Sequence, residues 1–378
     1  MNAPPHRAIR ALHVYSGNLY GGVERMLATF AATRVEGLEH SFALCFEGRP
    51  ADELRAAAAP PHMLGAARAS RPWTVLRARR RLRRVLDEVR PDAVICHSTW
   101  AQALFGRMAR EREVPLVFWL HDAVTGTTWA DAGARRTRPD FAICTSEFAR
   151  GTLPGLWAHV PSEVVYPPVA ASGPAQADPA SLRAAFQTRD DDTVILQASR
   201  MEPWKGQRLL IEGLGRMRDV SGWTCWIAGG AQRPAEEAHL AEMYALAQQL
   251  GIARRIRFLG QRDDVPALMV AADVYCQPNL GPEPFGIAFV EAMHAGLPIV
   301  ATAIGGAREI VDASCGILVP PEDPAALADA LRTLLADGAL RAWLGAAGPA
   351  RARALCDPRR QGEKLRDALA RVPSSTPA

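Results

Sequence analysis

The chain has 378 residues, of which 48% are hydrophobic and 22% are charged. This length exceeds that of one ordinary α/β core, and the composition is that of a folded globular protein, so disordered and fibrous classes are excluded. No apolar run reaches the eighteen or so residues of a membrane span, and Met1 to Arg10 lack the apolar segment of a signal peptide, so we expect a cytoplasmic protein.

The formal net charge of +4 is unevenly distributed. Residues 1–168 contain 22 arginines and no lysine against 16 acidic residues, whereas the remainder contains 22 basic and 24 acidic residues. A positively charged first part would attract an anionic partner. The seven cysteines include no Cys-x-x-Cys pair and lack the spacing of metal ligands, so we expect reduced thiols in the core.

Short β-branched runs alternate with longer Ala-, Arg- and Leu-rich stretches along the first half, a pattern that predicts βαβ units and a parallel sheet. The expected strands are 9–15, 41–46, 93–97, 115–120 and 140–145, and the expected helices include 23–36, 73–89 and 100–112.

A second series with the same plan follows a proline-rich segment at 167–181. Its expected strands are 193–199, 223–228, 255–259, 273–277, 298–302 and 316–319, with helices near 205–218, 234–250, 263–271, 286–295 and 324–336. We therefore predict two doubly wound domains with the hinge at 167–174. The predicted parts are a first domain at 1–168, a linker at 169–192, a second domain at 193–354, and a C-terminal helix and tail at 355–378 that packs back on the first domain.

The loop after the strand at 193–199 contains two cations, Arg200 and Lys205, ahead of a helix from Gly206. In open α/β sheets ligands bind beyond the carboxyl ends of strands, so both cations are placed to bind an anion. An isolated pair of this kind is more often a solvated strand end, but Trp204 and the pattern downstream favour binding.

That downstream pattern is Glu283-Pro-Phe-Gly-Ile-Ala-Phe-Val-Glu291. Pro284 keeps Glu283 extended, and the helix that starts near Phe285 or Gly286 offers free backbone amides and a positive dipole end to a diphosphate. Glu291, deeper in the helix, can accept hydrogen bonds from two adjacent ribose hydroxyls. A capped amphipathic helix is the plainer interpretation of this segment alone.

Taken together, Ser199-Arg200-x4-Lys205-Gly206 and Glu283-x7-Glu291, followed by Ala292-Met293-x-Ala295-Gly296-x-Pro298, resemble the second-half pattern of the family-4 retaining glycosyltransferases. The resemblance covers essentially the whole second domain. It implies the GT-B fold, in which two doubly wound Rossmann-like domains face a central cleft, and the activity of a hexosyl- or glycosyltransferase. It further implies that 1–168 is the acceptor-side domain and 193–354 the nucleotide-sugar-binding domain.

The resemblance also implies residue roles. Arg200 and Lys205 would neutralise the donor diphosphate, Glu291 would bind the ribose, Glu283 would touch the donor sugar, and the backbone amides of Gly286, Ile287 and Ala288 would meet the donor. It implies no metal and no cofactor other than the nucleotide-diphosphate sugar that serves as donor.

In the first half the signal is thinner. Gly21 and Gly22 open a helix after the strand at 9–15, where close approach of an anion to the backbone is favoured. The family has a Gly-Gly-x-Glu element here, so Gly21 and Gly22 resemble contacts to the donor phosphates or the acceptor, with Glu24 as support. His121 ends a buried strand, and the matching family position is a histidine that points at the donor sugar. His97 and Thr145 to Glu147 end other strands and are weaker candidates.

The stretch 73–89 predicts a basic amphipathic helix, with Val75, Leu82, Val85, Leu86 and Val89 on one face and Arg77, Arg80, Arg81 and Arg84 towards the other. Such a helix either makes a peripheral contact with anionic lipid at the inner membrane face or is a solvated surface helix; the sequence favours neither.

Other functions fit less well. A nicotinamide oxidoreductase needs Gly-x-Gly-x-x-Gly after a strand, which neither half contains. Asp190 to Asp192 resembles the Asp-x-Asp of metal-dependent transferases by letter, but it precedes a strand and is better explained as a turn. No nucleic-acid-binding module is present, so we expect no nucleic-acid partner.

We therefore expect a retaining transferase that moves a sugar from a nucleotide-diphosphate sugar to a glycan or lipid-linked acceptor in bacterial polysaccharide biosynthesis. Two alternatives remain: a GT-B-fold epimerase of sugar nucleotides, and a non-catalytic sugar-nucleotide-binding component of a polysaccharide assembly complex.

Overall fold

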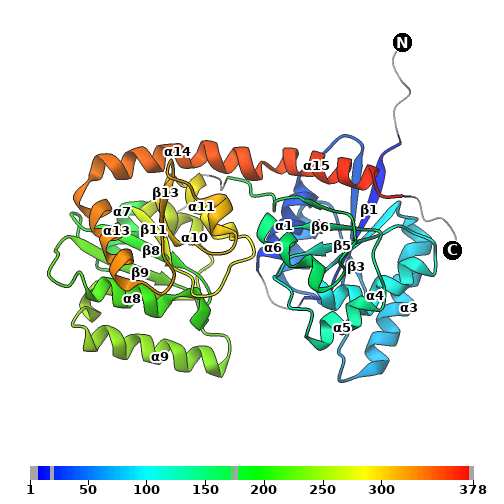
Figure 1. The fold of residues 1–378 in the computed structure, drawn as a ribbon, viewed down its shortest axis with the longest axis horizontal. Helices are drawn as coiled ribbons and strands as arrows, with labels where there is room; N and C mark the ends of the chain where they lie inside the picture. The colour runs from blue at the N-terminus through cyan, green and yellow to red at the C-terminus, as the bar shows by residue number, and fades with distance from the viewer. Residues whose placement is uncertain (1–6, 18–20, 172, 174–177, 374–378) are drawn as a thin grey trace, which may run out of the picture. The chain divides into compact units, whose positions relative to one another are not determined.

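The computed structural model describes residues 7–17, 21–171, 173 and 178–373. The chain divides into two compact units, Met1–Ala170 with Cys356–Ala378, and Ala171–Leu355. Each unit is built on a parallel β-sheet connected through helices, as Figure 1 shows. This is the doubly wound α/β organisation predicted from the alternating strand and helix patterns.

Over the described residues, the first unit has a seven-stranded sheet in the order β3-β2-β1-β4-β5-β6-β7. Its strands are β1 (Ile9–Tyr15), β2 (Leu38–Leu44), β3 (His62–Met63), β4 (Ala93–His97), β5 (Leu116–Leu120), β6 (Phe141–Cys144) and β7 (Ser162–Val164). Its helices are α1 (Gly22–Ala32), α2 (Arg49–Ala56), α3 (Pro72–Val89), α4 (Ser98–Arg110), α5 (Trp129–Arg135), α6 (Glu147–Thr152), the 3₁₀ helix η1 (Leu153–Gly155) and α15 (Pro358–Ala370).

The described part of the second unit has a six-stranded sheet in the order β10-β9-β8-β11-β12-β13. Its strands are β8 (Thr193–Ala198), β9 (Trp223–Ala228), β10 (Ile256–Gly260), β11 (Val274–Gln277), β12 (Ile299–Thr302) and β13 (Gly316–Val319). Its helices are α7 (Pro179–Ala185), η2 (Pro203–Lys205), α8 (Gln207–Gly215), α9 (Pro234–Gln249), η3 (Ala253–Arg255), α10 (Val265–Ala271), α11 (Ile287–His294), α12 (Ala307–Ile310), α13 (Pro324–Ala336) and α14 (Gly338–Cys356).

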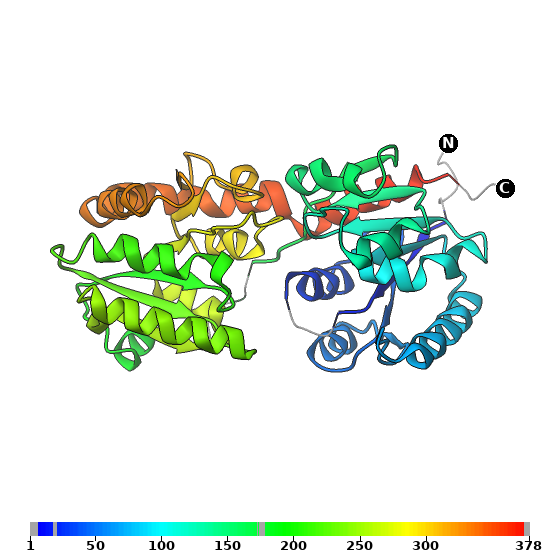
Figure 2. The same ribbon diagram turned by 60° about the horizontal axis from the view of Figure 1, so that its bottom comes forward.

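Helices cover both faces of the second sheet. On one face α8, α9 and α13 contribute apolar side chains to the core around β8, β9 and β11, and Figure 2 shows α8 and α9 running next to each other. On the other face α7 packs against α10. Arg183 of α7 donates hydrogen bonds to the Asp273 carboxylate at 2.7 Å and to the Ala271 carbonyl at 3.0 Å, which attaches α7 to this unit.

The segment 169–192, predicted as a linker, therefore contains a helix, and the second unit begins at Ala171. Sequence reasoning passed over α7 because it is short and follows a proline-rich stretch, so it shows little periodicity. Of the predicted hinge at 167–174, Ser172 and Pro174 lie outside the described residues.

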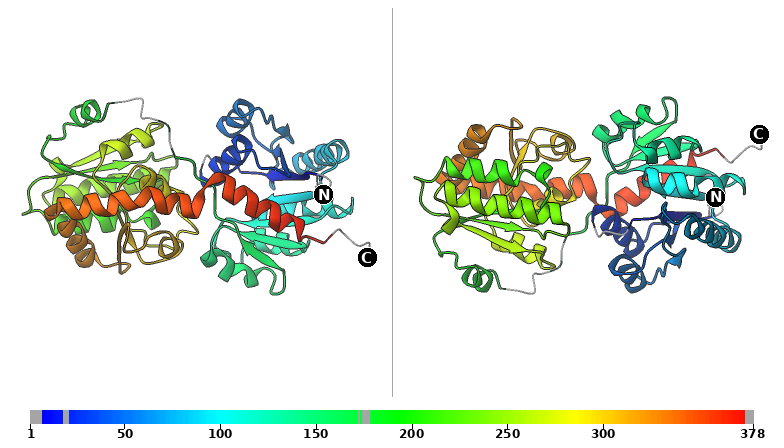
Figure 3. Two further views of the ribbon diagram at one scale, coloured as in Figure 1. Left: turned by 90° about the horizontal axis from the view of Figure 1, so that it is seen from above. Right: turned by 90° about the horizontal axis from the view of Figure 1, so that it is seen from below.

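The C-terminal helix α15 belongs to the first unit. Leu365, Ala368 and Leu369 are buried in the same core as Phe30 of α1 and Trp119 of β5. Figures 1 and 3 show this red helix lying over the strands of that unit. The last segment of the chain thus completes the core of the first unit, although more than 180 residues of the second unit, Ala171–Leu355, separate them in sequence.

All seven cysteines are free and buried, as expected from their apolar surroundings. Burial raises the pKa of the Cys45, Cys96 and Cys144 thiols to about 12, which keeps them in the unreactive thiol form. Among the described residues, none of the helices combines the length and the apolar character needed to span a bilayer.

Four histidines form a hydrogen-bonded row inside the first unit. The row runs from His40 on β2 to His13 on β1, His97 at the end of β4 and His121 directly after β5, and these strands are neighbours in that order. The joined atoms are Nδ1 of His40 and Nε2 of His13 (2.9 Å), Nδ1 of His13 and Nε2 of His97 (2.8 Å), and Nδ1 of His97 and Nε2 of His121 (2.8 Å).

Burial keeps these imidazoles neutral. It lowers the pKa of His40 to about 4 and that of His121 to about 3, and it holds the pKa of His13 and His97 well below the usual 6.5, helped by the neighbouring histidines. The unfolded chain would bind a proton at each near pH 6.5, so the unfolded state takes up more protons as the pH falls.

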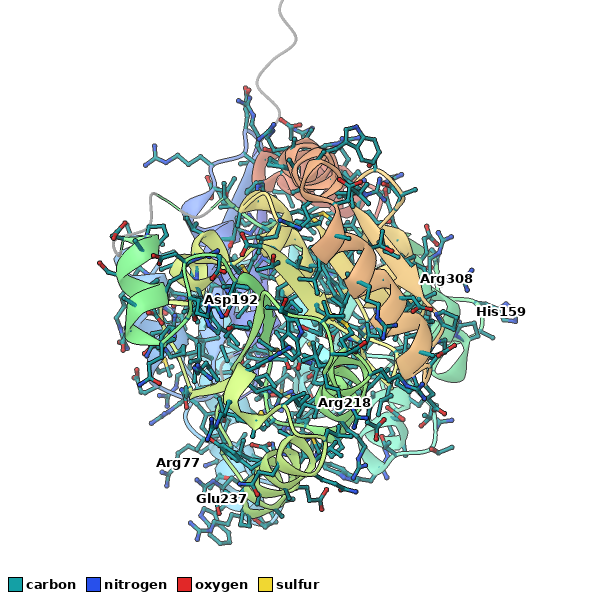
Figure 4. The ribbon with its side chains drawn as sticks, turned by 90° about the vertical axis from the view of Figure 1, so that its left-hand side faces the viewer. Arg77, His159, Asp192, Arg218, Glu237 and Arg308 are labelled. Carbon is teal, nitrogen blue, oxygen red and sulfur yellow. The ribbon has the colours of Figure 1, made fainter. Side chains whose placement is uncertain are left out.

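We expect the free energy of unfolding to decrease as the pH is lowered from about 7 to about 5, by about 2 kcal/mol for each histidine that stays neutral in the fold. Urea unfolding followed by circular dichroism at several pH values measures this. A His159→Gln variant is the matched control, because His159 is exposed and projects outward in Figure 4, and its pH dependence should equal that of the parent. A free energy that is constant over this window would contradict the buried neutral row.

Candidate functional site

The residues predicted to bind an anion in the second unit lie beyond the carboxyl ends of β8 and β11. The sheet order changes direction between β8 and β11, because β9 and β10 lie to one side of β8 and β12 and β13 lie to the other side of β11. In open parallel sheets, ligands bind at this switch point, where adjacent loops diverge.

The loop after β8 carries both predicted cations. Arg200 forms an ion pair with Glu202 at 3.1 Å, and 41% of the arginine side chain is exposed. Glu202 also accepts a hydrogen bond from Nε1 of Trp204 at 3.0 Å. The ammonium of Lys205 lies 3.8 Å from the centre of the Trp204 ring, so the indole supports the lysine through a cation–π contact.

Lys205 and Glu283, 78 residues apart in sequence, form an ion pair in the structure. Only 12% of the lysine side chain and 16% of the glutamate side chain are exposed. The pair is therefore largely desolvated and its electrostatic interaction is stronger than at an open surface. A lysine ammonium has three donors, so Lys205 can hold Glu283 and still donate to a ligand.

A series of hydrogen bonds between buried polar side chains runs from β11 to Glu283. Asn279 donates to the Glu283 carboxylate at 3.3 Å, and Gln277 donates to Oδ1 of Asn279 at 3.1 Å. The hydroxyl of Tyr275 donates to Gln277 at 2.6 Å and lies 3.2 Å from the Ala198 carbonyl of β8. This series connects β11 with β8 and fixes the position of Glu283.

The helix α11 starts at Ile287, with Gly286 as its N-cap in the left-handed region at φ +107°. A Cβ atom on Gly286 would lie 2.5 Å from the Phe289 ring, so this position requires glycine. Ile287 and Ala288 occupy the first turn, where amide groups have no intrahelical acceptor. The expected start near Phe285 or Gly286 was one or two residues early.

Glu291 lies in the second turn of α11 and is partly buried. Burial first, and then the nearby Glu291 and Glu283 carboxylates, hold the pKa of Tyr275 well above its usual 10. Both carboxylates therefore lie close enough to the Tyr275 hydroxyl to raise its pKa, which places them in the same region of the site. Their positions on either side of the helix start are consistent with this proximity.

The loop after β12 supports the backbone around Glu283. The Gly306 amide donates to the Glu283 carbonyl at 2.7 Å, and Gly305, with φ +59°, would place a Cβ atom 2.4 Å from that same oxygen. Thr302 donates its hydroxyl hydrogen to the Asn279 carbonyl at 2.7 Å. Three loops therefore position this one carboxylate.

In the first unit, Gly21 and Gly22 stand at the start of α1, as predicted. Glu24 accepts hydrogen bonds from the Gly21 amide at 2.9 Å and from the Tyr15 hydroxyl at 2.6 Å, so it ties the helix start to the end of β1. Among the described residues, the atom nearest to a Cβ placed on Gly21 would be a Glu24 carboxylate oxygen at 3.6 Å. Residues 18–20 of this loop lie outside the described residues.

His121 follows β5 and is the last member of the histidine row, 8% exposed. The ring of His97 stacks on it with 5.1 Å between ring centres, and the Tyr15 ring contacts His97 edge-on at 6.5 Å. Tyr15 thus joins the His121 end of the row to Glu24 and Gly21. By contrast Ser146, a weaker candidate, caps α6 by accepting from the Ala149 amide at 2.9 Å.

The structure thus brings Lys205, Glu283 and Glu291 together in the second unit, with the first turn of α11 beside Glu283, and it joins Gly21 to the histidine row in the first. Sequence reasoning missed Glu202, Asn279, Gln277 and the inner histidines His13 and His40. A polar side chain at the end of an apolar strand, as at Gln277, was the available signal, but its partners come from other strands.

The acidic run at 190–192 is structural. Asp191 pairs with Arg189 at 2.8 Å, and Asp192 accepts from the Thr224 hydroxyl at 2.6 Å at the amino end of β8, where Figure 4 labels it. Within the described residues, no cluster of three or more His, Cys, Asp or Glu side chains could hold a metal ion.

Two family models match the chain. Residues 20–172 match the model described as Glycosyltransferase Family 4, and residues 180–351 match Glycosyl transferases group 1. The first match begins at the glycine loop before α1 and the second contains Arg200, Lys205, Glu283 and Glu291.

Curated relatives agree with these models. The phosphatidyl-myo-inositol mannosyltransferase of Mycobacterium leprae is 42% identical over 160 residues, which cover 41% of this chain and 40% of the relative. The D-inositol 3-phosphate glycosyltransferase of Salinispora tropica is 32% identical over 278 residues, which cover 65% of this chain and 57% of the relative. The chain therefore spans 40 to 57% of the length of these two relatives.

Solved structures extend the likeness over nearly the whole chain. HepE of Anabaena, solved in complex with UDP-glucose, superposes with a TM-score of 0.82 at 24% identity and covers 96% of this chain and 99% of its own. WaaG, a glycosyltransferase involved in lipopolysaccharide biosynthesis, superposes with a TM-score of 0.67 at 18% identity and covers 96% and 100%. The fold is GT-B, and the chain belongs to glycosyltransferase family 4.

Proposed function

We propose that this protein is a retaining glycosyltransferase that moves a sugar from a nucleotide-diphosphate sugar to a glycan or lipid-linked acceptor. The observation that carries the proposal is the desolvated Lys205–Glu283 pair beside the first turn of α11, at the switch point of a parallel sheet. A cation, free helix amides and a nearby carboxylate are the groups that bind a diphosphate and a hydroxylated ring.

In this proposal Arg200, Lys205 and the amides of Gly286, Ile287 and Ala288 bind the diphosphate. Glu291 accepts hydrogen bonds from the ribose hydroxyls. Glu283 contacts the donor sugar, and Asn279 and Lys205 keep its carboxylate oriented.

The proposal also assigns roles to residues of the first unit. Gly21 and Gly22 contact the donor phosphates or the acceptor, and Glu24 holds their loop. His121 contacts the donor sugar. We also propose that no metal ion takes part, because Arg200 and Lys205 provide the positive charge that the diphosphate requires.

The chemical step would begin at the bond between the anomeric carbon and the phosphate oxygen. As this bond breaks, negative charge grows on the departing diphosphate, and each of the groups around it can lower the barrier by about 3–4 kcal/mol. The acceptor hydroxyl then forms the new bond to the anomeric carbon on the same face and gives its proton to a phosphate oxygen. The products are the glycoside, with its configuration retained, and the nucleoside diphosphate.

The names of the similar proteins support this class of substrate. HepE binds UDP-glucose in its solved complex, and the relatives in Mycobacterium leprae and Salinispora tropica are named for transfer to phosphatidyl-myo-inositol and to D-inositol 3-phosphate. Inositol-containing phosphates and phospholipids are therefore the first acceptors to test here, with UDP-, GDP- and ADP-sugars as donors.

We further propose that a cytoplasmic location is combined with peripheral contact to the inner membrane face through α3. Arg77, Arg80 and Arg84 lie on the exposed side of this helix, and the structure records no ion pair for them among the described residues. Figure 4 shows Arg77 projecting outward. Trp73 and Leu76 on the same helix are 61% and 54% exposed, which adds apolar area for insertion between lipids.

The decisive experiment screens nucleotide sugars for an increase in melting temperature and then analyses products with added acceptors. Transfer of the sugar with its anomeric configuration unchanged, also in the presence of EDTA, supports the proposal. Isomerised donor would identify an epimerase, and binding without turnover would identify a non-catalytic component.

Replacing Lys205 by alanine should lower turnover by roughly a hundredfold or more, because the charge on the leaving diphosphate loses its cation. Lys205→Arg keeps the charge and should retain more activity. The matched control is Lys364→Ala. Lys364 is the other lysine of the chain; it lies on α15, with its ammonium over the ring of Tyr166. Steady-state kinetics on variants with parental melting temperatures measures the effect; turnover within a few-fold of the parent would exclude Lys205 from this role.

Replacing Glu291 by alanine should weaken binding of the nucleoside diphosphate by roughly 10–100-fold, the loss expected for hydrogen bonds to a charged group. Isothermal titration calorimetry with UDP, GDP and ADP gives the dissociation constants. Glu237→Ala is the control, because Glu237 is an exposed glutamate of α9, labelled in Figure 4. Equal affinities for the Glu291 variant and the parent would contradict the ribose assignment.

Neutralising Arg77, Arg80 and Arg84 with glutamine should weaken binding to anionic liposomes by roughly a hundredfold, at about 1 kcal/mol for each basic residue near the surface. Sedimentation with vesicles of phosphatidylglycerol and phosphatidylcholine measures the partition. A variant with the exposed Arg216, Arg218 and Arg254 changed to glutamine has the same net charge and should bind like the parent. Equal partition of the two variants would show that α3 is an ordinary surface helix.

A further inference from the structure

Histidines in a hydrogen-bonded row are unusual inside the core of a parallel sheet. His13 and His97 are fully buried on β1 and β4, in positions where strands of this kind normally carry valine or isoleucine. Apolar side chains of similar size would pack there without needing hydrogen-bond partners. The row therefore calls for an explanation beyond packing.

Aromatic rings enclose the row along its length. Phe30 of α1 lies 6.2 Å from His13 and 5.4 Å from His40, measured between ring centres. Trp119 stacks on His97 at 5.3 Å and on His121 at 5.7 Å. These rings shield the imidazoles from water, and with burial they hold the histidines in the neutral form.

A neutral imidazole has one N–H donor and one acceptor nitrogen, so each histidine in the row donates to one neighbour and accepts from the other. Only two arrangements are consistent with the three contacts. Either every Nδ1 carries the hydrogen and the bonds point from His40 towards His121, or every Nε2 carries it and they point from His121 towards His40.

The free end at His40 distinguishes the two arrangements. Nε2 of His40 is buried and has no hydrogen-bond partner among the described residues. In the second arrangement this atom would be an N–H group without an acceptor, and orphaned buried N–H groups are rarer in proteins than under-satisfied acceptors. The first arrangement leaves only an acceptor lone pair there, so it is favoured.

We propose that His40, His13 and His97 form a positioning row that fixes His121 as the neutral tautomer with the hydrogen on Nδ1. Nε2 of His121 is occupied by the bond from His97, so Nδ1 is the ring nitrogen that remains for a ligand. His121 then donates a hydrogen bond to an oxygen of the bound sugar and acts neither as a general acid nor as a general base. The ligand contact rests on the proposed function, whereas the tautomer does not.

The proposal separates the roles of the four residues. His121 is the residue that touches the ligand, and His97 acts through it. Because an imidazole in a fixed tautomer offers a donor and no acceptor on its ligand side, the row selects for an oxygen with a lone pair facing Nδ1. A histidine with free choice of tautomer would make no such selection.

The test is nuclear magnetic resonance on the full chain with ¹⁵N-labelled histidine in a deuterated background. Two-bond ¹H–¹⁵N correlation spectra distinguish a protonated from an unprotonated ring nitrogen for each histidine, with assignment by single replacement. We expect a protonated Nδ1 and an unprotonated Nε2 at His121 in the parent. A protonated Nε2 at His121 would overturn the proposal.

Two replacements of His97 separate positioning from packing. His97→Leu removes the donor to His121, so His121 should lose its fixed tautomer and show both forms. His97→Asn places an amide N–H near the former Nδ1 and should restore the protonated Nδ1 of His121. An unchanged His121 tautomer in His97→Leu would also overturn the proposal.

If His97→Leu does not fold, the spectra of the parent still decide the proposal, because they report the protonated nitrogen of every histidine in the row. A hydrogen on Nε2 of His13 or His97 would contradict the direction of the bonds. Where transfer activity is measured, kcat should fall about tenfold in His97→Leu and recover in His97→Asn at matched melting temperatures. An absence of transfer in the parent would bear on the proposed function alone, because the spectra need no substrate.

Discussion

The candidate site of the second unit depends on one close contact between two loops. Gly206 has φ +77° and would place a Cβ atom 1.8 Å from the Pro278 carbonyl oxygen, so only glycine allows the loop after β8 to rest on the loop after β11. The Leu280 amide donates to the Trp204 carbonyl at 2.8 Å across the same contact. Because Lys205 directly precedes Gly206, this contact brings its ammonium to Glu283.

The ion pair between Lys205 and Glu283 determines the charge that the site would present to an anion. Two opposite charges that are largely removed from water stabilise each other only while both are present, and loss of one leaves the other desolvated. Asn279 also donates to Glu283, so the carboxylate has a second partner besides the lysine. In the proposed anion site the cation would thus be held in position by a pair without net charge.

In the first unit, neutral histidines rather than charged residues hold a side chain in position. Its histidine row crosses four neighbouring strands and ends at His121, and Tyr15 links the same region to Glu24 and Gly21. Both units therefore hold a polar side chain at the carboxyl edge of a sheet through a series of buried hydrogen bonds. In the second unit that series begins at Tyr275, and in the first it begins at His40.

The sequence alone determined the two doubly wound domains, because buried strands and amphipathic helices carry their periodicity locally; the predicted bounds of β1, β4, β9 and β13 agree with the structure. It also predicted Lys205, Glu283 and Glu291 as site residues, because a cation after a buried strand and two glutamates on either side of a helix start are local patterns. Tertiary structure alone decided that Lys205 reaches Glu283 and that four histidines form one row. Those partners lie on different strands, and their proximity follows from strand order and from glycine contacts such as that of Gly206.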